Sequence, residues 1–174
     1  LWVGTDAGLL SCSLPAVDCR SVDAPAALRG HIYALYSDTR GRLWVGAGSS
    51  VARFEDGHWI MLDAKPGAAA VRAFAETADG ALWMGTNGDG LLRYEHGRFT
   101  RIRESDGLPS NLIRALYVDA GGWLWVGTEG RGLARLDPRA WAGDGDDDGD
   151  AAADRRIVHI GVEHGLYDPV IHQI

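Results

Sequence analysis

One four-residue phrase, Leu-Trp followed by Val or Met and then by Gly, occurs four times along the chain. Its tryptophans are Trp2, Trp44, Trp83 and Trp125. Self-similarity at a period of about 40 residues is typical of a repeat protein built from helical pairs or from four-stranded propeller blades. The residues between the phrases must therefore decide which unit is repeated.

Strand-like segments surround each later copy of the phrase. In the second copy, an alternating apolar run over 31–36 precedes the phrase, and runs over 51–54 and 58–62 follow it. Short alternating runs that are rich in β-branched and aromatic residues, separated by Asp- and Gly-rich turns, are typical of strands. The repeat thus predicts a blade of four antiparallel strands and an all-β chain with a β-propeller fold of about four repeats.

The link between the third and fourth strands predicts a tight hairpin. Asp56-Gly57 separates two alternating runs, and an Asp-Gly pair suits a type I′ turn because both of its central residues need positive φ. A two-residue loop fixes the register, which places Phe54 opposite Trp59. The same reasoning places Tyr94 opposite Phe99.

The repeats divide the whole chain, residues 1–174, into propeller segments. We expect a partial blade over 1–28, blades over 29–66, 67–104 and 105–162, and the start of a next blade or a closing strand over 163–174. The last complete blade carries an acidic insertion over 137–156. Because the chain starts inside a repeat and Val170–Ile174 resembles a first strand, we expect a fragment of a larger propeller. Closure of the two ends into one blade of a four-bladed ring is the alternative.

Two cysteines lie in the opening repeat. The expected register puts Cys19 opposite Cys12, and directly opposed strand residues bring their Cβ atoms close to the range that a disulfide requires. A disulfide in an oxidising compartment and two small buried thiols both remain open. Two cysteines without histidines at ligand spacing do not indicate a metal site.

Composition limits the functions of the chain. The formal net charge of −7 argues against a nucleic-acid surface, and no apolar run is as long as a membrane span. The acidic run Asp144–Asp150 matches the first half of a calcium loop, but Arg155 replaces its final Glu, so we interpret the run as a solvated loop. No catalytic motif, metal site or cofactor site is predicted, and nothing indicates an enzyme.

The chain resembles the two-component regulator propeller repeat family. The resemblance is carried by the Asp-Gly-Leu-Pro-Ser-Asn string over 106–111 and by the Leu-Trp-Val-Gly-Thr string over 124–128. The segment from Gly85 to Tyr94 is similar to the second half of the same pattern. Copies in tandem cover nearly all of the chain; the second copy departs most, since Gly46-Ala47 replaces Gly-Thr and no Gly-Leu-Pro precedes it.

The resemblance implies a role in bacterial signalling. It implies a non-catalytic sensory module on the extracytoplasmic, periplasmic side, before a kinase or diguanylate cyclase output domain. Its expected partners are a small-molecule or glycan ligand, adjacent blades and the output domain of the parent chain, and a second copy in a homodimer. No contact of this segment with a membrane or with nucleic acid is expected.

Candidate binding residues come from the loops at one end of the blades. Loops between strands two and three share an end with the connections between blades, because neighbouring strands are antiparallel. The candidate ligand-binding residues are His31, Asn87, Asp89, Asn111, Glu129, Arg131 and Tyr167. Turn chemistry is the alternative role of Asn87, Asp89 and Asn111. The four repeated tryptophans are expected to pack one blade against the next.

Two other functional classes remain open. Propellers also host enzymes, among them lyases in which a histidine and a charged partner do acid–base chemistry. His31 or His164 within hydrogen-bond reach of Glu129 or Arg131 would favour that class. A protein-interaction scaffold without a small ligand is the other alternative.

Overall fold

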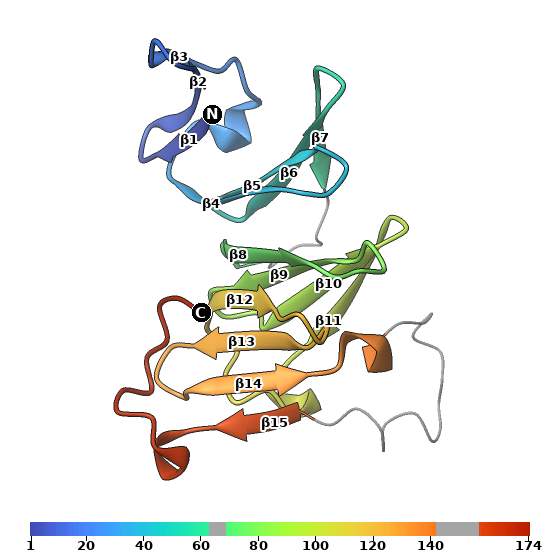
Figure 1. Cartoon of the computed structure of the whole chain (residues 1–174). Coiled ribbons are helices and arrows are strands. Elements are labelled where there is room, and N and C mark those ends of the chain that lie inside the picture. The colour runs from blue at the N-terminus through green and yellow to red at the C-terminus, as the bar shows by residue number, and fades with distance from the viewer. Residues whose placement is uncertain (63–68, 142–156) are drawn as a thin grey trace.

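The computed structural model describes residues 1–62, 69–141 and 157–174. Its strands form one three-stranded and three four-stranded antiparallel sheets, and strands that are consecutive in sequence are neighbours within each sheet. The sheets follow one another along the chain (Figure 1). The predicted all-β propeller architecture with four-stranded blades is confirmed.

The strands follow one another along the chain in the order that the repeats predict. The first sheet contains β1 (Trp2–Thr5), β2 (Gly8–Ser13) and β3 (Asp18–Ser21). The second contains β4 (Ile32–Ser37), β5 (Leu43–Ala47), β6 (Ser50–Glu55) and β7 (His58–Leu62). The third contains β8 (Val71–Glu76), β9 (Leu82–Thr86), β10 (Leu91–Glu95) and β11 (Arg98–Ile102). The fourth contains β12 (Ile113–Val118), β13 (Leu124–Thr128), β14 (Leu133–Leu136) and β15 (Ile157–Ile160).

Short 3-10 helices lie in the connections. They are η1 (Ala26–Leu28), η2 (Glu104–Asp106), η3 (Pro138–Trp141) and η5 (Val162–His164). Three of them, η1, η2 and η5, precede the first strand position of a repeat. They shape the connections at the end of the blades where the candidate residues are expected.

The hairpin register follows the prediction. Phe54 pairs with Trp59 across β6 and β7, and Tyr94 pairs with Phe99 across β10 and β11. In both pairs the ring centroids are 4.8 Å apart. Asp56 has a φ of +50°, and the glycine after it has a φ of +79°, as a type I′ turn requires.

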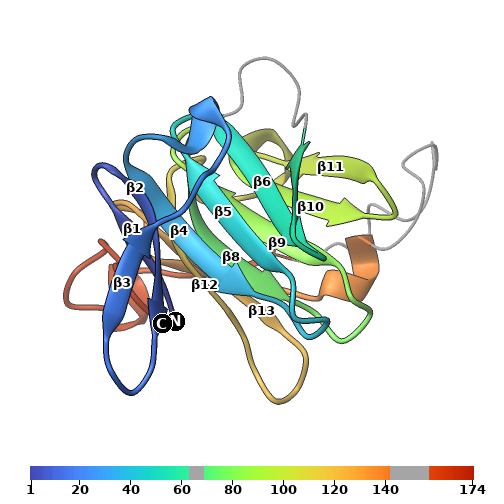
Figure 2. The same ribbon diagram turned by 90° about the horizontal axis from the view of Figure 1, so that it is seen from above.

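The first strands of successive blades lie side by side, and the glycine that ends each Leu-Trp phrase allows their close approach. Strands β4, β8 and β12 are neighbours in Figure 2, and β8 contacts both of the others. A Cβ atom on Gly85 would lie 2.5 Å from Cγ2 of Ile113, in the first strand of the next blade. Glycine is therefore required where one blade contacts the next.

Three of the four repeated tryptophans also contact the neighbouring blade. Trp2 meets Phe54 edge-on with centroids 5.7 Å apart, and Trp44 meets Tyr94 in the same way at 5.6 Å. Trp83 is fully buried in an apolar cluster with residues of the next blade. Trp125 is partly exposed and contacts Arg135.

The opening sheet contains the two cysteines. Cys12 and Cys19 are directly opposite in the β2–β3 pair, as the expected register requires. In the structure their sulfurs are joined in a disulfide. Of the two alternatives left open by the sequence, the structure has the bonded one.

One expected strand is absent from the described residues. Val170–Ile174 resembles a first strand, but it forms no strand and does not pair with β1, whose sheet contains β1 to β3 alone. Within the described residues, this segment therefore does not complete the sheet of β1 to β3. The acidic run Asp144–Asp150 and its calcium alternative lie outside the described residues.

Candidate ligand-binding site

Antiparallel strands give each blade two ends with different loops. Turns between the first and second strands lie at one end, while the turns between the second and third strands and the connections between blades lie at the other. Backbone hydrogen bonds join the latter two kinds of loop. The amide of Gly90 donates to the carbonyl of Asn111 at 3.1 Å, and that of Gly132 donates to Pro169 at 2.8 Å. The loops that carry the candidate residues are thus held together.

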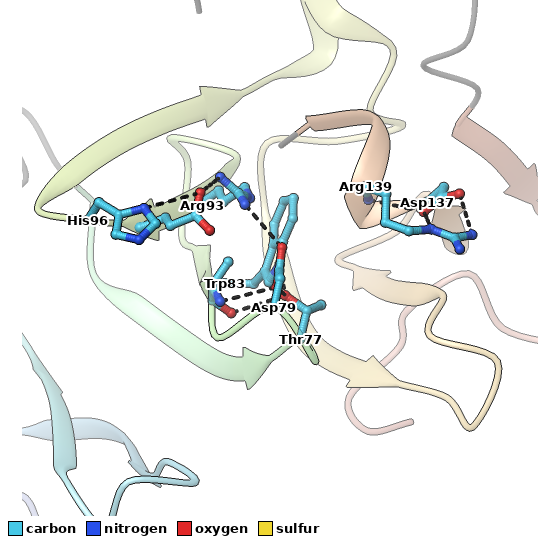
Figure 3. A network of polar contacts seen from close by, with 9 residues as sticks. Thr77, Asp79, Trp83, Arg93, His96, Asp137 and Arg139 are labelled. Atoms are coloured by element: carbon cyan, nitrogen blue, oxygen red, sulfur yellow. Dashed lines mark hydrogen bonds and ion pairs between the residues drawn. The ribbon is translucent and has the colours of Figure 1, made fainter. Parts of the chain in front are cut away.

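The opposite end is held by polar contacts within each blade. In the third sheet, Nε1 of Trp83 donates to Oγ1 of Thr77 at 3.1 Å (Figure 3). The guanidinium of Arg93 pairs with Asp79 at 3.2 Å and with Glu95 at 2.9 Å. Because these side chains bind one another, this end serves the stability of the blade.

The first strand of every complete blade contains a β-bulge at the same place. The pairing of β4 with β5 shifts around Tyr33, that of β8 with β9 around Arg72, and that of β12 with β13 around Arg114. A bulge redirects a side chain out of the regular alternation and is common next to functional sites. The three repeats therefore place a Tyr or an Arg at equivalent positions at the candidate end.

His172 occupies the same position of the repeat in the C-terminal segment. The residue before it, Ile171, lies against Gly127, as Ile113 lies against Gly85 in the preceding blade. The amide of Ile171 donates to the carbonyl of Thr128 at 3.0 Å. The segment thus follows the path of a first strand at this one point.

Tyr33 is in contact with His31, which directly precedes its own strand, and with Arg72 of the next sheet. Its ring centroid lies 4.1 Å from Cζ of Arg72 and 4.2 Å from the centroid of the His31 ring. Nδ1 of His31 lies 2.5 Å from Oδ1 of Asp6, in the β1–β2 turn. These contacts form a continuous path across three sheets.

Glu129 connects the bulge of the last blade to its β13–β14 turn. Its Oε2 accepts hydrogen bonds from Nε and an Nη of Arg114, at 3.1 and 2.7 Å. These bonds lower the pKa of Glu129, and the charges of Arg72 and His172 lower it further. The carboxylate therefore lies within electrostatic reach of three basic side chains.

These side chains form what we call the polar cluster. It consists of His31, Tyr33, Arg72, Arg114, Glu129 and His172. Its members come from the first-strand positions of four successive repeats and from one turn. A ligand that contacts them would bridge blades.

Arg72 differs from the other arginine of the cluster in its polar contacts. Arg114 is paired with Glu129, whereas no described residue forms a hydrogen bond or ion pair with Arg72. Its Nε is buried and has no hydrogen-bond partner. Arg72 is thus a partly buried cation that packs on an aromatic ring and has donors without acceptors.

The candidate residues predicted from the sequence have different surroundings. His31 and Glu129 belong to the polar cluster. Asp89 is buried and forms ion pairs with Arg101 and Arg103. The side-chain oxygen of Asn111 accepts from the backbone amide of Glu104 at 3.0 Å, and the amide of Asn87 donates to the carbonyl of Ala70 at 2.9 Å. The side chains of Asp89 and Asn111 therefore bind within the loops, whereas the contact of Asn87 is made by its backbone.

Arg131 and Tyr167 lie apart from these contacts. Arg131 is exposed and lines a groove of about 520 Å³ together with His159 and Glu163. Tyr167 is fully exposed. His164 pairs with Glu163 at 3.0 Å, and in the described part of the chain neither His31 nor His164 is in contact with Glu129 or Arg131.

Sequence reasoning missed four members of the cluster. They are Tyr33, Arg72, Arg114 and His172. The signal was present in the repeats, because each of these polar residues directly follows an Ile or a Val at the same place. Alternation alone assigned these positions to a regular strand, and it gives no sign of a bulge.

Two further features were sought in the described residues: a metal site and a membrane-spanning helix. No group of three or more His, Cys, Asp or Glu side chains is arranged there to hold a metal ion. The helices of these same ranges are too short or too polar to cross a membrane.

The two-component regulator propeller model matches three segments of the chain: residues 28–49, 66–88 and 107–130. Each segment spans a first strand position and the Leu-Trp phrase that follows it. These three segments of the chain match two-component regulator propeller repeats. No curated protein sequence matches it significantly.

Solved structures with the same fold include extracellular domains from B. thetaiotaomicron. The domain of BT3049, assigned to a hybrid two-component system, superimposes with a TM-score of 0.75 at 20% identity over 99% of this chain. That of BT4673, assigned to a one-component system, gives 0.74 at 20% identity over 99%. This chain spans 22% and 23% of the length of those two structures.

An enzyme shares the fold as well. Virginiamycin B lyase from Staphylococcus aureus superimposes with a TM-score of 0.67 at 14% identity, over 92% of this chain and 51% of the lyase. At such identities the likeness to these structures shows the fold alone. The function must be argued from the site itself.

Proposed function

We propose that this chain is part of the extracytoplasmic, periplasmic sensory propeller of a bacterial signalling protein and binds a small ligand at the polar cluster without catalysis. Adjacent blades and a kinase or diguanylate cyclase output domain would belong to the parent chain. The parent would act as a homodimer. The repeat family and the extracellular domains that share the fold support this role.

The observation that carries the proposal is the position of the cluster across blade boundaries. Arg72 of β8 packs on Tyr33 of β4, and Arg72 also acts electrostatically on Glu129 of the following blade. A ligand that binds these side chains would interact differently with different arrangements of the blades. It would thereby bias the packing that the rest of the protein reads.

The disulfide supports the proposed compartment. Cys12 and Cys19 are joined in the β2–β3 hairpin. Structural disulfides persist mainly in oxidising surroundings such as the periplasm.

A ligand screen tests the proposal. The melting temperature of the chain should rise in the presence of a ligand, because a molecule that binds only the folded state stabilises it. Arg114→Met should reduce this rise by removing the cation that holds Glu129. Arg40→Met, at an exposed position in a turn at the opposite end, is the matched control. A ligand whose effect survives Arg114→Met and Arg72→Met would place binding elsewhere.

The same screen separates a sensor from an enzyme. A sensory module returns the ligand unchanged, whereas a lyase converts it. Mass spectrometry of the ligand after incubation should recover the starting compound in full. A product that forms with the wild-type chain and not with His31→Ala would favour the enzymatic class instead.

A further inference from the structure

We propose that the polar cluster binds the carboxylate group of a small organic acid, with the guanidinium of Arg72 as its main partner. This inference rests on the proposed sensory function and narrows the class of its ligand.

The geometry of Arg72 suits a carboxylate. Its guanidinium is held against the Tyr33 ring, at 4.1 Å from the centroid, so the planar group has a defined orientation. A guanidinium presents donors in a fork that matches the two oxygens of a carboxylate. The Nε of Arg72 is buried, and no described residue forms a hydrogen bond or ion pair with the guanidinium, so a ligand carboxylate would pair with its Nη donors.

The charge of the cluster indicates a monovalent anion. Arg72 and Arg114 contribute two positive charges, and Glu129 contributes one negative charge. Because Glu129 is paired with Arg114, one ligand carboxylate would balance the charge of Arg72. A dianion would place excess negative charge near Glu129, which like-charge repulsion disfavours.

The aromatic neighbours would contact the rest of the ligand. Tyr33, on which Arg72 packs, also contacts the ring of His31; Tyr33 is partly buried and His31 is exposed. The charge of His172 acts on Glu129. An organic acid therefore fits these surroundings better than a bare inorganic ion, because its carbon atoms can pack against the rings.

The test uses a chain with isotope-labelled arginine, and acetate is the probe. Acetate is titrated at constant ionic strength, and the Nε–Hε resonances of the arginines are followed by NMR. We expect a saturable shift of the Arg72 resonance with acetate and none with acetamide, the neutral analogue. Absence of a saturable acetate shift at Arg72 would overturn the proposal, as would binding of sulfate more tightly than acetate.

Variants assign the effect to the cluster. Arg72→Met should weaken acetate binding, followed on the remaining resonances, at least about tenfold, since a charge-assisted bidentate contact is lost. Arg72→Lys keeps the charge without the fork and should retain part of the affinity. Glu129→Gln should strengthen binding, because it removes the competing carboxylate. Arg40→Met is the control, and affinity that is the same in all variants would contradict the assignment.

The acetate experiment can fail or succeed independently of the test of the proposed sensory function. Acetate binding is measured on the chain itself and requires no signalling output. If the ligand screen yields a neutral compound whose binding is insensitive to Arg72→Met, the sensory function stands and the carboxylate inference fails. If acetate binds at Arg72 while organic acids leave the output of the parent protein unchanged, the carboxylate inference stands and the sensory function fails.

Discussion

The indole Nε1 of Trp44 donates a 2.7 Å hydrogen bond to Oδ2 of Asp38, a carboxylate that is almost fully buried. Arg42 donates to the same oxygen at 2.5 Å. The contact recurs between Trp125 and Asp119, also at 2.7 Å. Trp44, which packs on Tyr94 of the next blade, is therefore held by Asp38, a carboxylate at the end of the blade opposite the candidate site.

Removal of that carboxylate should destabilise the chain. In Asp38→Ala, the buried indole N–H of Trp44 loses its acceptor, and the backbone amides of Arg40 and Arg42 lose theirs. We expect a loss of about 2 to 3 kcal/mol of unfolding free energy, measured by urea titration. Asp18→Ala is the control, because Asp18 forms an exposed ion pair with Arg20, and it should change stability by less than about 0.5 kcal/mol.

The same carboxylates predict acid sensitivity. Burial raises the pKa of Asp38, but hydrogen bonds from Trp44 and Arg42 outweigh it and lower the pKa overall. The hydrogen bond from Trp125 lowers the pKa of Asp119 in the same direction. Since a lowered pKa in the folded state means that the ionised form is stabilised, this contribution is complete above the unfolded-state pKa of about 3.9 and is lost as the pH falls further.

We expect ionisation of these carboxylates to be complete near neutral pH, so that the melting temperature does not depend on their titration there, and to see the melting temperature decrease as the pH falls below about 4. Asp119→Asn keeps an oxygen acceptor for the indole but cannot ionise. Its melting temperature should therefore fall less steeply with acid than that of the wild type. Equal slopes for the two proteins would contradict this explanation.

Because two blades approach closely at Gly85, even a methyl side chain at this position should lower the stability of the chain. In Gly85→Ala, the new methyl group would lie 2.5 Å from Cγ2 of Ile113. The neighbouring blade must move, and we expect a loss of about 1 to 3 kcal/mol in denaturant unfolding. Gly30→Ala is the matched control, because a Cβ there meets no atom within 4 Å. Similar stabilities of the two variants would rule out this role of Gly85.

Reduction of the disulfide should destabilise the opening sheet. The Cys12–Cys19 bond closes a short loop between β2 and β3, and closing a loop of this size contributes about 2 kcal/mol through the unfolded state. Hydrogen exchange of the β2 and β3 amides should become faster after reduction, while exchange in the third sheet stays the same. Cys12→Ser/Cys19→Ser should reproduce the effect without reductant; unchanged exchange in β2 and β3 would contradict it.

Much of the fold follows from local sequence. The Asp56-Gly57 pair fixes a hairpin because its backbone conformation admits few residues, and the register of Phe54 and Trp59 follows from it. The repeated Leu-Trp phrase sets the order of strands because its period matches one blade. The sequence alone therefore predicts the hairpin register, which one turn determines, and the order of the strands, which the repeat period determines.

The site depended on contacts that no local pattern shows. Arg72 follows Val71 in what reads as a regular strand, and the bulge that redirects it arises from pairing with the next strand. Its packing on Tyr33 is a contact between blades, so it requires their arrangement. In the third sheet, Thr77 stands where the other repeats have Asp38 and Asp119, and it accepts the hydrogen bond of the repeated tryptophan in their place.

The central claim is that the polar cluster is where the chain binds its signal. Hydrogen–deuterium exchange with and without the compound that raises the melting temperature most tests it directly. We predict slower exchange at residues 31–33, 70–72, 112–114 and 129, with no change at the opposite turns 38–41 and 119–122. Protection confined to those opposite turns, or a screen in which no compound raises the melting temperature, would contradict the claim.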